Sequence, residues 1–222
     1  MTDNRARTFI EANTRMLRPP LVPEVTLHLA EESLPIWRKS EEELGEMNVP
    51  PPYWAFVWAG GQALARYILD TPETVTGKTV LDIGSGSGLV AIAAALAGAK
   101  RVIANDIDAF AIAACRLNAA ANQAAVDIVA VDLLACGSGA PIVPSCDVAL
   151  LGDLFYEKEL AARALTFAAG ARRDGSRVLV GDPRRSFFPV DRFTRCASYA
   201  VPVTRELEDS EIKKTTVWEF ED

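Results

Sequence analysis

One ten-residue stretch, Thr79 to Gly88 (TVLDIGSGSG), constrains the fold more than any other part of the chain. It begins with a short apolar run that only Asp82 interrupts. Three glycines follow this run, at Gly84, Gly86 and Gly88. A tight strand-to-helix turn needs glycine, because glycine adopts positive φ without strain and lets a ligand approach bare backbone. The apolar run Leu89 to Leu96 then predicts a helix whose free N–H groups favour a nucleotide-like ligand with a carboxylate or phosphate.

The type of nucleotide depends on how the glycines are read. From Gly86, the letters GSGLVA satisfy the dinucleotide pattern G-x-G-x-x-A, which favours NAD. Asp82 points elsewhere, because a carboxylate inside a buried strand is costly without a cationic partner. Asp106 ends the next expected strand, Arg101 to Asp106, and its position suits a carboxylate that binds ribose hydroxyls. Both kinds of cofactor contain ribose, so Asp106 does not choose between them, and capping the next helix is its competing role.

Length and charge exclude several classes of protein. The 222 residues, of which 50% are hydrophobic, are enough for one sizeable α/β core. The formal net charge of −7 disfavours a nucleic-acid partner. No apolar run is long enough to span a bilayer, and the four cysteines form no C-x-x-C pair. We therefore expect a cytoplasmic enzyme with no metal site and no membrane or nucleic-acid partner.

The pattern D-x-G-x-G-x-G from Asp82 resembles motif I of the seven-β-strand methyltransferases that use S-adenosylmethionine. The resemblance implies that Asp82 lies close to the amino group of the methionine moiety and that the three glycines lie under the ligand. It also implies that Asp106 binds the ribose. Asp132 and Leu133, which follow a third expected strand over 126–131, are implied to face the adenine.

The segment before motif I, PPYWAFVWAGGQALARYILD, contains four aromatic residues within six positions. Core or lid packing is the simplest interpretation of most of these rings. The segment also resembles methyltransferase family 16, a family of protein lysine methyltransferases, and especially its branch acting on the β-subunit of electron-transfer flavoprotein. This resemblance implies that Trp58 and Gly61 lie close to the cofactor.

Residues 152–157 (GDLFYE) follow the fourth expected strand, Cys146 to Leu151, and are expected to open a helix. They resemble the D-x-x-Y/F signature of family 16, with Asp153 and Tyr156 as its marked residues. The resemblance implies that Asp153 holds the substrate lysine while Tyr156 lines a channel for its alkyl stem. Helix capping by Asp153 and simple packing by Tyr156 are the alternatives.

The order of expected elements predicts an α/β fold with a Rossmann-like, seven-stranded methyltransferase sheet and helices on both faces. The sheet is expected to be mostly parallel, with an antiparallel edge hairpin over 199–207 and 213–220, which argues against a dehydrogenase. A helix-like segment is expected over 187–197, an N-terminal helix over 3–17, and a second amphipathic or irregular segment over 34–46. Residues 1–50 are expected to form an extension that covers the cleft and recognises substrate, and residues 51–222 the methyltransferase domain.

These resemblances imply a protein-lysine N-methyltransferase that uses S-adenosylmethionine and acts on the electron-transfer flavoprotein β-subunit. Three alternatives stay open. Gly84 to Asn122 also resembles the cofactor half of the ribosomal-protein L11 methyltransferases, although GDLFYE is not the asparagine-led motif expected there. An NAD-linked oxidoreductase and a non-enzymatic module that binds S-adenosylmethionine are the other two.

Overall fold

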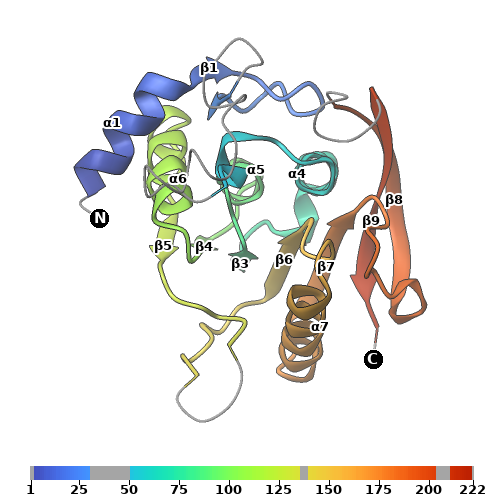
Figure 1. Cartoon of the computed structure of the whole chain (residues 1–222). Helices are drawn as coiled ribbons and strands as arrows, with labels where there is room; N and C mark the ends of the chain where they lie inside the picture. Colours follow the sequence, from blue (N-terminus) through green and yellow to red (C-terminus); the bar gives the residue numbers. More distant parts are fainter. Residues whose placement is uncertain (1–2, 31–50, 136–139, 204–210, 222) are drawn as a thin grey trace.

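The computed structural model describes residues 3–30, 51–135, 140–203 and 211–221. Their core is a seven-stranded sheet with the strand order β5-β4-β3-β6-β7-β9-β8 (Figure 1). The strands are β3 (Thr79–Ile83), β4 (Arg101–Asn105), β5 (Asp127–Val129), β6 (Val148–Gly152), β7 (Arg177–Asp182), β8 (Phe193–Pro202) and β9 (Ile212–Phe220). Strands β5, β4, β3, β6 and β7 are parallel, whereas β9 runs antiparallel to both β7 and β8. The expected mostly parallel sheet with an antiparallel C-terminal edge is therefore confirmed.

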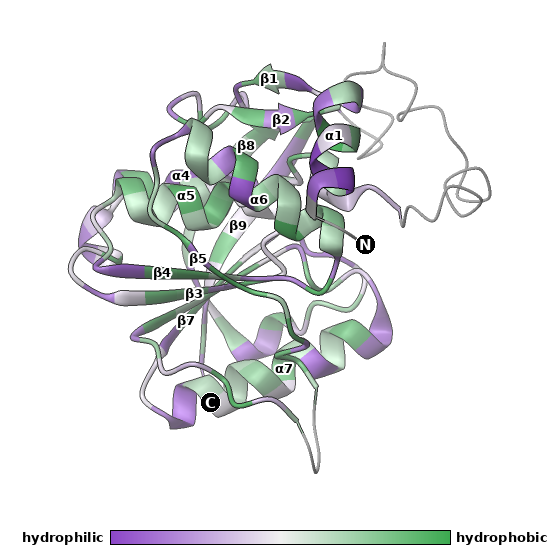
Figure 2. Ribbon diagram, turned by 90° about the vertical axis from the view of Figure 1, so that its left-hand side faces the viewer, coloured by the Kyte–Doolittle hydropathy of each residue, from purple (hydrophilic) through white to green (hydrophobic). Residues whose placement is uncertain are grey.

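Helices cover both faces of this sheet (Figures 1 and 2). The helices α4 (Ala59–Asp70), α5 (Leu89–Leu96) and α6 (Ala109–Ala121) lie on one face, and α7 (Lys158–Arg173) lies on the other. Alternate residues of each central strand enter the two cores. Val80 packs with α4 and α5, whereas its neighbour Leu81 packs with α7. A parallel sheet buried in this way needs strands that are apolar on both sides, as the run VALL in β6 is.

The N-terminal residues 3–30 pack on the α6 side of the domain. They form α1 (Asp3–Asn13) and a short antiparallel pair, β1 (Arg15–Leu17) with β2 (Leu27–Leu29). The side chains of Asn118 and Asn122 in α6 accept hydrogen bonds from the backbone N–H groups of His28 and Thr26, at 2.7 and 2.9 Å. The expected helix over 3–17 is too long, because α1 ends at Asn13 and residues 15–17 form β1. The expected segment over 34–46 lies outside the described residues.

Three short 3₁₀ turns complete the described elements: η1 (Tyr53–Ala55), η2 (Pro72–Thr74) and η3 (Val190–Arg192). The expected helix-like segment over 187–197 is wrong, because only η3 is helical there and β8 begins at Phe193. The expectation that residues 152–157 open a helix is also wrong, because α7 begins at Lys158. Asp153 has φ +56°, a left-handed conformation that no α-helix contains. Within the described residues, no helix is both long and apolar enough to cross a membrane.

Candidate active site

A cleft of approximately 480 Å³ opens at the carboxyl ends of β3, β4 and β6. The chain connections of a doubly wound sheet diverge at such a point, because β3 is followed by β4 on one side and is paired with β6 on the other. A smaller hollow of approximately 60 Å³ continues from the cleft under the glycine turn. The residues predicted from sequence to form the site line these two spaces, with the exceptions of Gly88 and Leu133.

The glycine turn after β3 has the geometry that the sequence predicts. Gly84, Gly86 and Gly88 have φ values of +65°, +51° and +82°. A Cβ atom on Gly84 would lie 2.8 Å from Leu154, and one on Gly88 would lie 2.8 Å from the sulfur of Cys115. Backbone conformation and packing thus both require glycine at these two positions, and α5 begins directly after the turn.

Asp82 is 1% exposed and lies inside β3, and its Oδ2 atom has no hydrogen-bond partner among the described residues. Burial raises the pKa of this carboxyl to about 7. A buried carboxylate oxygen without a partner carries a large desolvation penalty, which a cationic ligand group would remove. Because Asp82 lines the hollow under the glycine turn, the site is built for a ligand with a positively charged end.

Asp106 follows β4, and three backbone N–H groups hold its carboxylate. Oδ2 accepts a hydrogen bond from Gly86 at 2.9 Å, and Oδ1 accepts from Ile107 at 2.8 Å and Asp108 at 3.0 Å. Capping of α6 belongs to Asp108 instead, whose side chain accepts from the N–H of Phe110 at 2.9 Å. A carboxylate has about four acceptor positions, so Asp106 keeps capacity for ribose hydroxyls at the wall of the cleft.

The loop after β5 places Asp132 and Leu133 differently from each other. Asp132 lines the cleft and forms an ion pair with Arg163 of α7, which also donates to the backbone oxygen of Leu134 at 3.2 Å. Leu133 is 4% exposed and packs in the core between the sheet and α7. Leu134, the next residue, lines the cleft in its place. A turn between Asp132 and Ala135 reverses the chain here, which moves the apolar contact by one residue.

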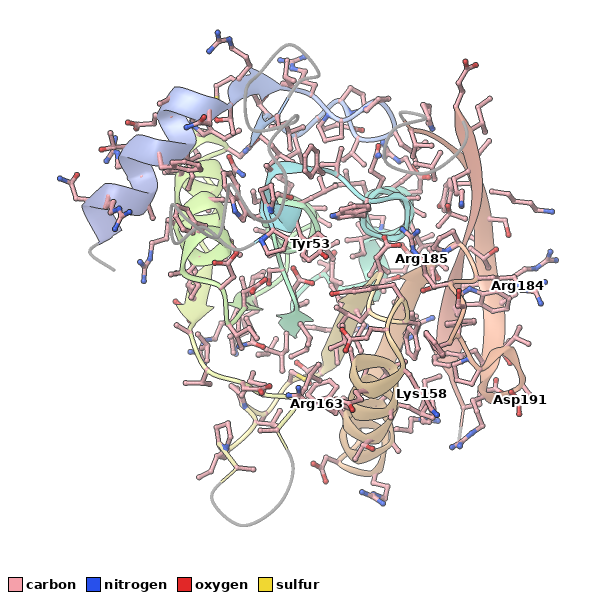
Figure 3. The ribbon with its side chains drawn as sticks, viewed as in Figure 1. Tyr53, Lys158, Arg163, Arg184, Arg185 and Asp191 are labelled. Atoms are coloured by element: carbon pink, nitrogen blue, oxygen red, sulfur yellow. The ribbon has the colours of Figure 1, made fainter. Side chains whose placement is uncertain are left out.

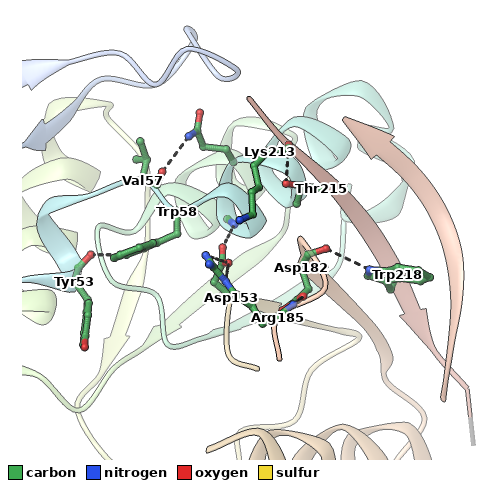
Figure 4. Close-up of polar contacts among 11 residues, drawn as sticks. Tyr53, Val57, Trp58, Asp153, Asp182, Arg185, Lys213, Thr215 and Trp218 are labelled. Carbon is green, nitrogen blue, oxygen red and sulfur yellow. Dashed lines mark hydrogen bonds and ion pairs between the residues drawn. The ribbon is translucent and has the colours of Figure 1, made fainter. Parts of the chain in front are cut away.

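Aromatic rings form one side of the cleft mouth. Tyr53 is in contact with Trp58, with ring centroids 5.9 Å apart, and with Tyr156 at 6.1 Å. The indole N–H of Trp58 donates to the backbone oxygen of Tyr53 at 3.0 Å, which fixes the ring (Figure 4). Tyr53 and Tyr156 are 50% and 46% exposed, so the rings line an open mouth and not a closed core. Trp54 is the exception, since it is buried and stacks on Phe110.

Asp153 lies at the centre of this side of the cleft (Figure 4). Its Oδ2 atom accepts a hydrogen bond from the backbone N–H of Gly61 at 3.1 Å, and its Oδ1 atom accepts two from Arg185. Gly61 is the third residue of α4, so Asp153 satisfies one of the N–H groups that a helix leaves free at its start. Asp153 thus caps a helix far from it in sequence, and not the following helix as the alternative interpretation had it.

Comparison with known proteins identifies the family. The chain is 39% identical to the electron transfer flavoprotein beta subunit lysine methyltransferase of Xenopus laevis, over 97% of this chain and 87% of that protein. It is 35% identical to the human protein of the same name, over 99% of this chain and 83% of that protein. The chain belongs to the electron transfer flavoprotein beta subunit lysine methyltransferase family. The family model named ribosomal protein L11 methyltransferase (PrmA) matches residues 62–143.

The solved structures agree with this lysine methyltransferase family at the level of the fold. Magnesium protoporphyrin IX methyltransferase from Synechocystis, solved with bound S-adenosylmethionine, has a TM-score of 0.52 and 14% identity. The match covers 85% of this chain and 88% of that one. Because its relatives at 35–39% identity over nearly the whole chain are lysine methyltransferases, the protein is an S-adenosylmethionine-dependent methyltransferase. The dinucleotide interpretation of the glycine turn is not supported.

The residues of this lysine methyltransferase fit S-adenosylmethionine. The cofactor carries an ammonium group, ribose hydroxyls and an adenine, and the cleft offers one feature for each. Asp82 supplies a buried, unpartnered carboxylate oxygen for the cation, and Asp106 supplies acceptors for hydroxyls. Asp132 and Leu134 line the remaining wall on the β5 side. The roles of these individual residues stay predictions.

The sequence did not point to Arg163 or Arg185 as residues of the site. Both line the cleft, Arg163 from α7 and Arg185 from the loop after β7 (Figure 3). The letters DPRRS after β7 did contain a signal, because an aspartate followed by proline favours a turn that returns the chain to the strand end. Nothing local marks Arg163, since its partner Asp132 lies 31 positions away.

Proposed function

We propose that the enzyme transfers methyl groups from S-adenosylmethionine to lysine side chains of the electron-transfer flavoprotein β-subunit. The observation that carries this proposal is the identity of 39% over nearly the whole chain to a relative named for that activity. This similarity covers 97% of the chain, so it includes the glycine turn and also the segment with Asp153 and Tyr156. The L11 methyltransferase model, by contrast, ends at residue 143 and includes neither residue.

The chemistry that the site must perform is simple to state. When it is bound, S-adenosylmethionine supplies a methyl group on a positively charged sulfur, and an amine lone pair displaces that sulfur in line. The protein contributes alignment, exclusion of water and control of the proton on the amine. An unperturbed lysine has a pKa of about 10.4, so near neutral pH it arrives mostly protonated.

The aromatic mouth supports a channel for a lysine stem. Tyr53, Trp58 and Tyr156 present ring faces and edges at the cleft, and rings of this kind pack against an alkyl chain and attract its cationic end. Asp153 lies beside them and is 6% exposed. We propose that one of its oxygens accepts an N–H of the lysine amine, which leaves the amine lone pair directed away from the carboxylate. Tyr156 then orients the stem.

The remaining predictions concern the N-terminal residues and the cell. Residues 1–50 are proposed to recognise the protein substrate. The described residues 3–30 support this only in that they are held firmly, for example by the hydrogen bond from Ala30 to Ala55 at 2.8 Å beside the aromatic segment. A cytoplasmic location and the absence of nucleic-acid and membrane partners also stay predictions.

The test is an incubation with radiolabelled S-adenosylmethionine and recombinant electron-transfer flavoprotein, followed by mapping of labelled peptides by mass spectrometry. Label on lysines of the β-subunit is expected. The Asp153→Asn variant is the matched control, since it keeps an acceptor for Gly61 but removes the charge. Ribosomal protein L11 is tested in parallel. Label on L11 with none on the flavoprotein would overturn the proposed substrate.

A further inference from the structure

The loop after β7 directs Arg185 to the candidate lysine site. Asp182 ends β7, and its Oδ1 atom accepts a hydrogen bond from the backbone N–H of Arg185 at 2.7 Å. Arg184, between them, has φ +68°, a conformation that a residue with a side chain adopts only when its surroundings impose it. The turn returns the chain to the strand end, so that Arg185 extends along the wall of the cleft, whereas Arg184 is exposed (Figures 3 and 4).

Arg185 forms an ion pair with Asp153, called the Asp153–Arg185 pair below. The Nε and Nη2 atoms of Arg185 both donate to Oδ1 of Asp153, at 2.9 and 2.7 Å. The two side chains are 18% and 8% exposed, so solvent screens the pair only weakly. The guanidinium carbon also lies 5.9 Å from the centre of the Trp58 ring. A guanidinium therefore occupies the two features, carboxylate and aromatic face, that would attract a lysine ammonium.

The opposite side of Asp153 is closed by backbone. Oδ2 accepts from Gly61, and a Cβ atom on Gly60 would lie only 2.5 Å from the same oxygen. Residues around Asp153 thus hold the carboxylate in one orientation. The carboxylate lines the cleft beside the guanidinium.

The charge of this arrangement matters for the reaction. A carboxylate alone would stabilise a lysine in its protonated form, which has no lone pair and cannot accept a methyl group. An arginine guanidinium does not lose its proton in proteins, so it balances Asp153 at every pH at which the enzyme is folded. A fixed cation beside the site also lowers the pKa of a second amine that approaches it.

We propose that Arg185 is a positioning residue that acts through Asp153: it neutralises and orients this carboxylate, so that Asp153 accepts a hydrogen bond from the neutral amine instead of holding a protonated lysine. This inference rests on the lysine methylation proposed above. It assigns to Arg185 control of the fraction of substrate lysine that is reactive at neutral pH.

Among the described residues, other titratable groups lie close to the pair or to Tyr156 at the cleft mouth, and their effect must be separated from this one. They are Asp182 at the end of β7, Tyr156 and Glu157 in the loop after β6, Tyr53 before α4, and Asp106 after β4. Burial raises the pKa of Asp182 to about 7, within the pH range of the assay. Burial raises the pKa of the Tyr156 hydroxyl above its ordinary value of 10.0, which removes it from that range. Asp182→Asn therefore serves as a control, because it keeps the acceptor for Arg185 without titrating.

The first experiment measures kcat/KM against pH with the recombinant flavoprotein β-subunit as substrate, for wild type, Arg185→Met, Arg185→Lys and Asp182→Asn. In wild type, kcat/KM is expected to rise with pH as the lysine loses its proton. Arg185→Met is expected to move this rise to higher pH by about one unit, because the substitution removes the positive charge of the guanidinium beside Asp153. Arg185→Lys restores the charge and returns the rise towards its wild-type position. Asp182→Asn leaves it in place.

The second experiment needs no turnover. A peptide that carries the target lysine is titrated into each variant with S-adenosylhomocysteine bound, beside the same peptide with norleucine, which has no charge. Arg185→Met is expected to bind the lysine peptide several-fold more tightly than wild type at pH 7 and the norleucine peptide equally well. Thermal unfolding and cofactor affinity establish that each variant is folded.

Each contrary result has a distinct meaning. A rate that falls in Arg185→Met by the same factor at every pH, with no change in preference between the two peptides, would show a merely structural role and overturn the inference alone. A rise that disappears in Asp182→Asn would assign the titration to Asp182 and also overturn it. Wild type that labels no lysine at any pH would overturn the proposed function, and this inference with it.

Discussion

Asp153 and Gly61 are joined by a hydrogen bond of 3.1 Å between a side chain after β6 and the first turn of α4, although 92 positions separate them in the chain. Asp153, which the sequence marks for substrate binding, thus also connects the start of α4 to the end of β6. Function and stability are therefore coupled at this position, and a substitution there must be interpreted for both.

Asp153→Ala is expected to abolish methyl transfer and also to lower the free energy of unfolding by about 2 kcal/mol. The substitution leaves the N–H of Gly61 and the guanidinium of Arg185 without this acceptor. Asp153→Asn keeps an acceptor for Gly61 and is expected to cost less stability while still impairing transfer. Denaturant unfolding and the labelling assay measure the two effects separately. Normal transfer by Asp153→Ala would show that the assigned role is wrong.

Cofactor affinity is expected to rise with pH through about 7 because of Asp82. Its pKa in the folded, ligand-free protein is about 7, above the ordinary 3.8, so below pH 7 the cofactor's cation must displace a proton. Between pH 5.5 and 7, affinity should increase by up to about tenfold per pH unit. Asp82→Asn should bind weakly at every pH, with no such slope. Calorimetric titration over this range is the measurement, and a flat wild-type profile would contradict the assignment.

The stability of the ligand-free protein should show the opposite trend with pH. Asp82 and Asp182 both have raised pKa values of about 7, so the folded state holds their protons more tightly than the unfolded chain does. The free energy of unfolding should therefore fall as the pH rises from about 4 to about 7, as far as these two groups determine it. Asp182→Asn should weaken this fall and leave the pH dependence of cofactor binding unchanged.

Asp106→Ala is expected to weaken cofactor binding by about ten- to a hundred-fold, with the fold retained. The change removes the ribose acceptor and also the bonds that hold Gly86, Ile107 and Asp108 in place. Asp106→Asn, which can keep some of these bonds, separates the two losses. An affinity for S-adenosylmethionine equal to that of wild type in Asp106→Ala would remove Asp106 from the site.

Gly60→Ala is expected to destabilise the fold, by about 2 kcal/mol or more, because its Cβ would lie 2.1 Å from the backbone oxygen of Gly181. Gly170→Ala is the matched control. It lies within α7, and its Cβ would meet only the end of the Arg173 side chain, at 4.0 Å, so stability should rise by about 0.5–1 kcal/mol. Comparable unfolding midpoints for the two variants would refute the close approach of α4 to β7.

Local patterns were enough to predict the secondary structure around the glycine turn. The bounds of α5, Leu89–Leu96, are those that the sequence predicts, because three glycines fix where the turn ends and apolar residues fix the helix. The first half of β8, before Tyr199, was missed for a specific reason. Its register shifts between Arg195 and Ala197, and this irregularity interrupts the alternation of apolar and polar residues by which a strand is recognised.

The surroundings of Asp153 and Tyr156, the candidate substrate-binding residues, could be predicted only in part. Asp153 and Tyr156 were marked by a resemblance. The left-handed backbone at Asp153 could not be predicted, because no glycine occupies that position. The partners of Asp153 come from α4 and from the loop after β7, and pairing over such distances leaves no local pattern. A smaller error, of one position, concerns the loop after β5. Leu133 was expected at the cleft, but it is buried and Leu134 lines the cleft instead.

The position of β9 between β7 and β8 has a consequence for how the protein is made. β9 is the last strand of the described sheet to leave the ribosome, yet it pairs along β7 through Asp182, the residue that shapes the turn carrying Arg185. Until β9 is synthesised, β7 is an unpaired edge. The cofactor half can thus assemble early during translation, whereas the Arg185 side of the cleft is completed only when the C-terminal strand arrives.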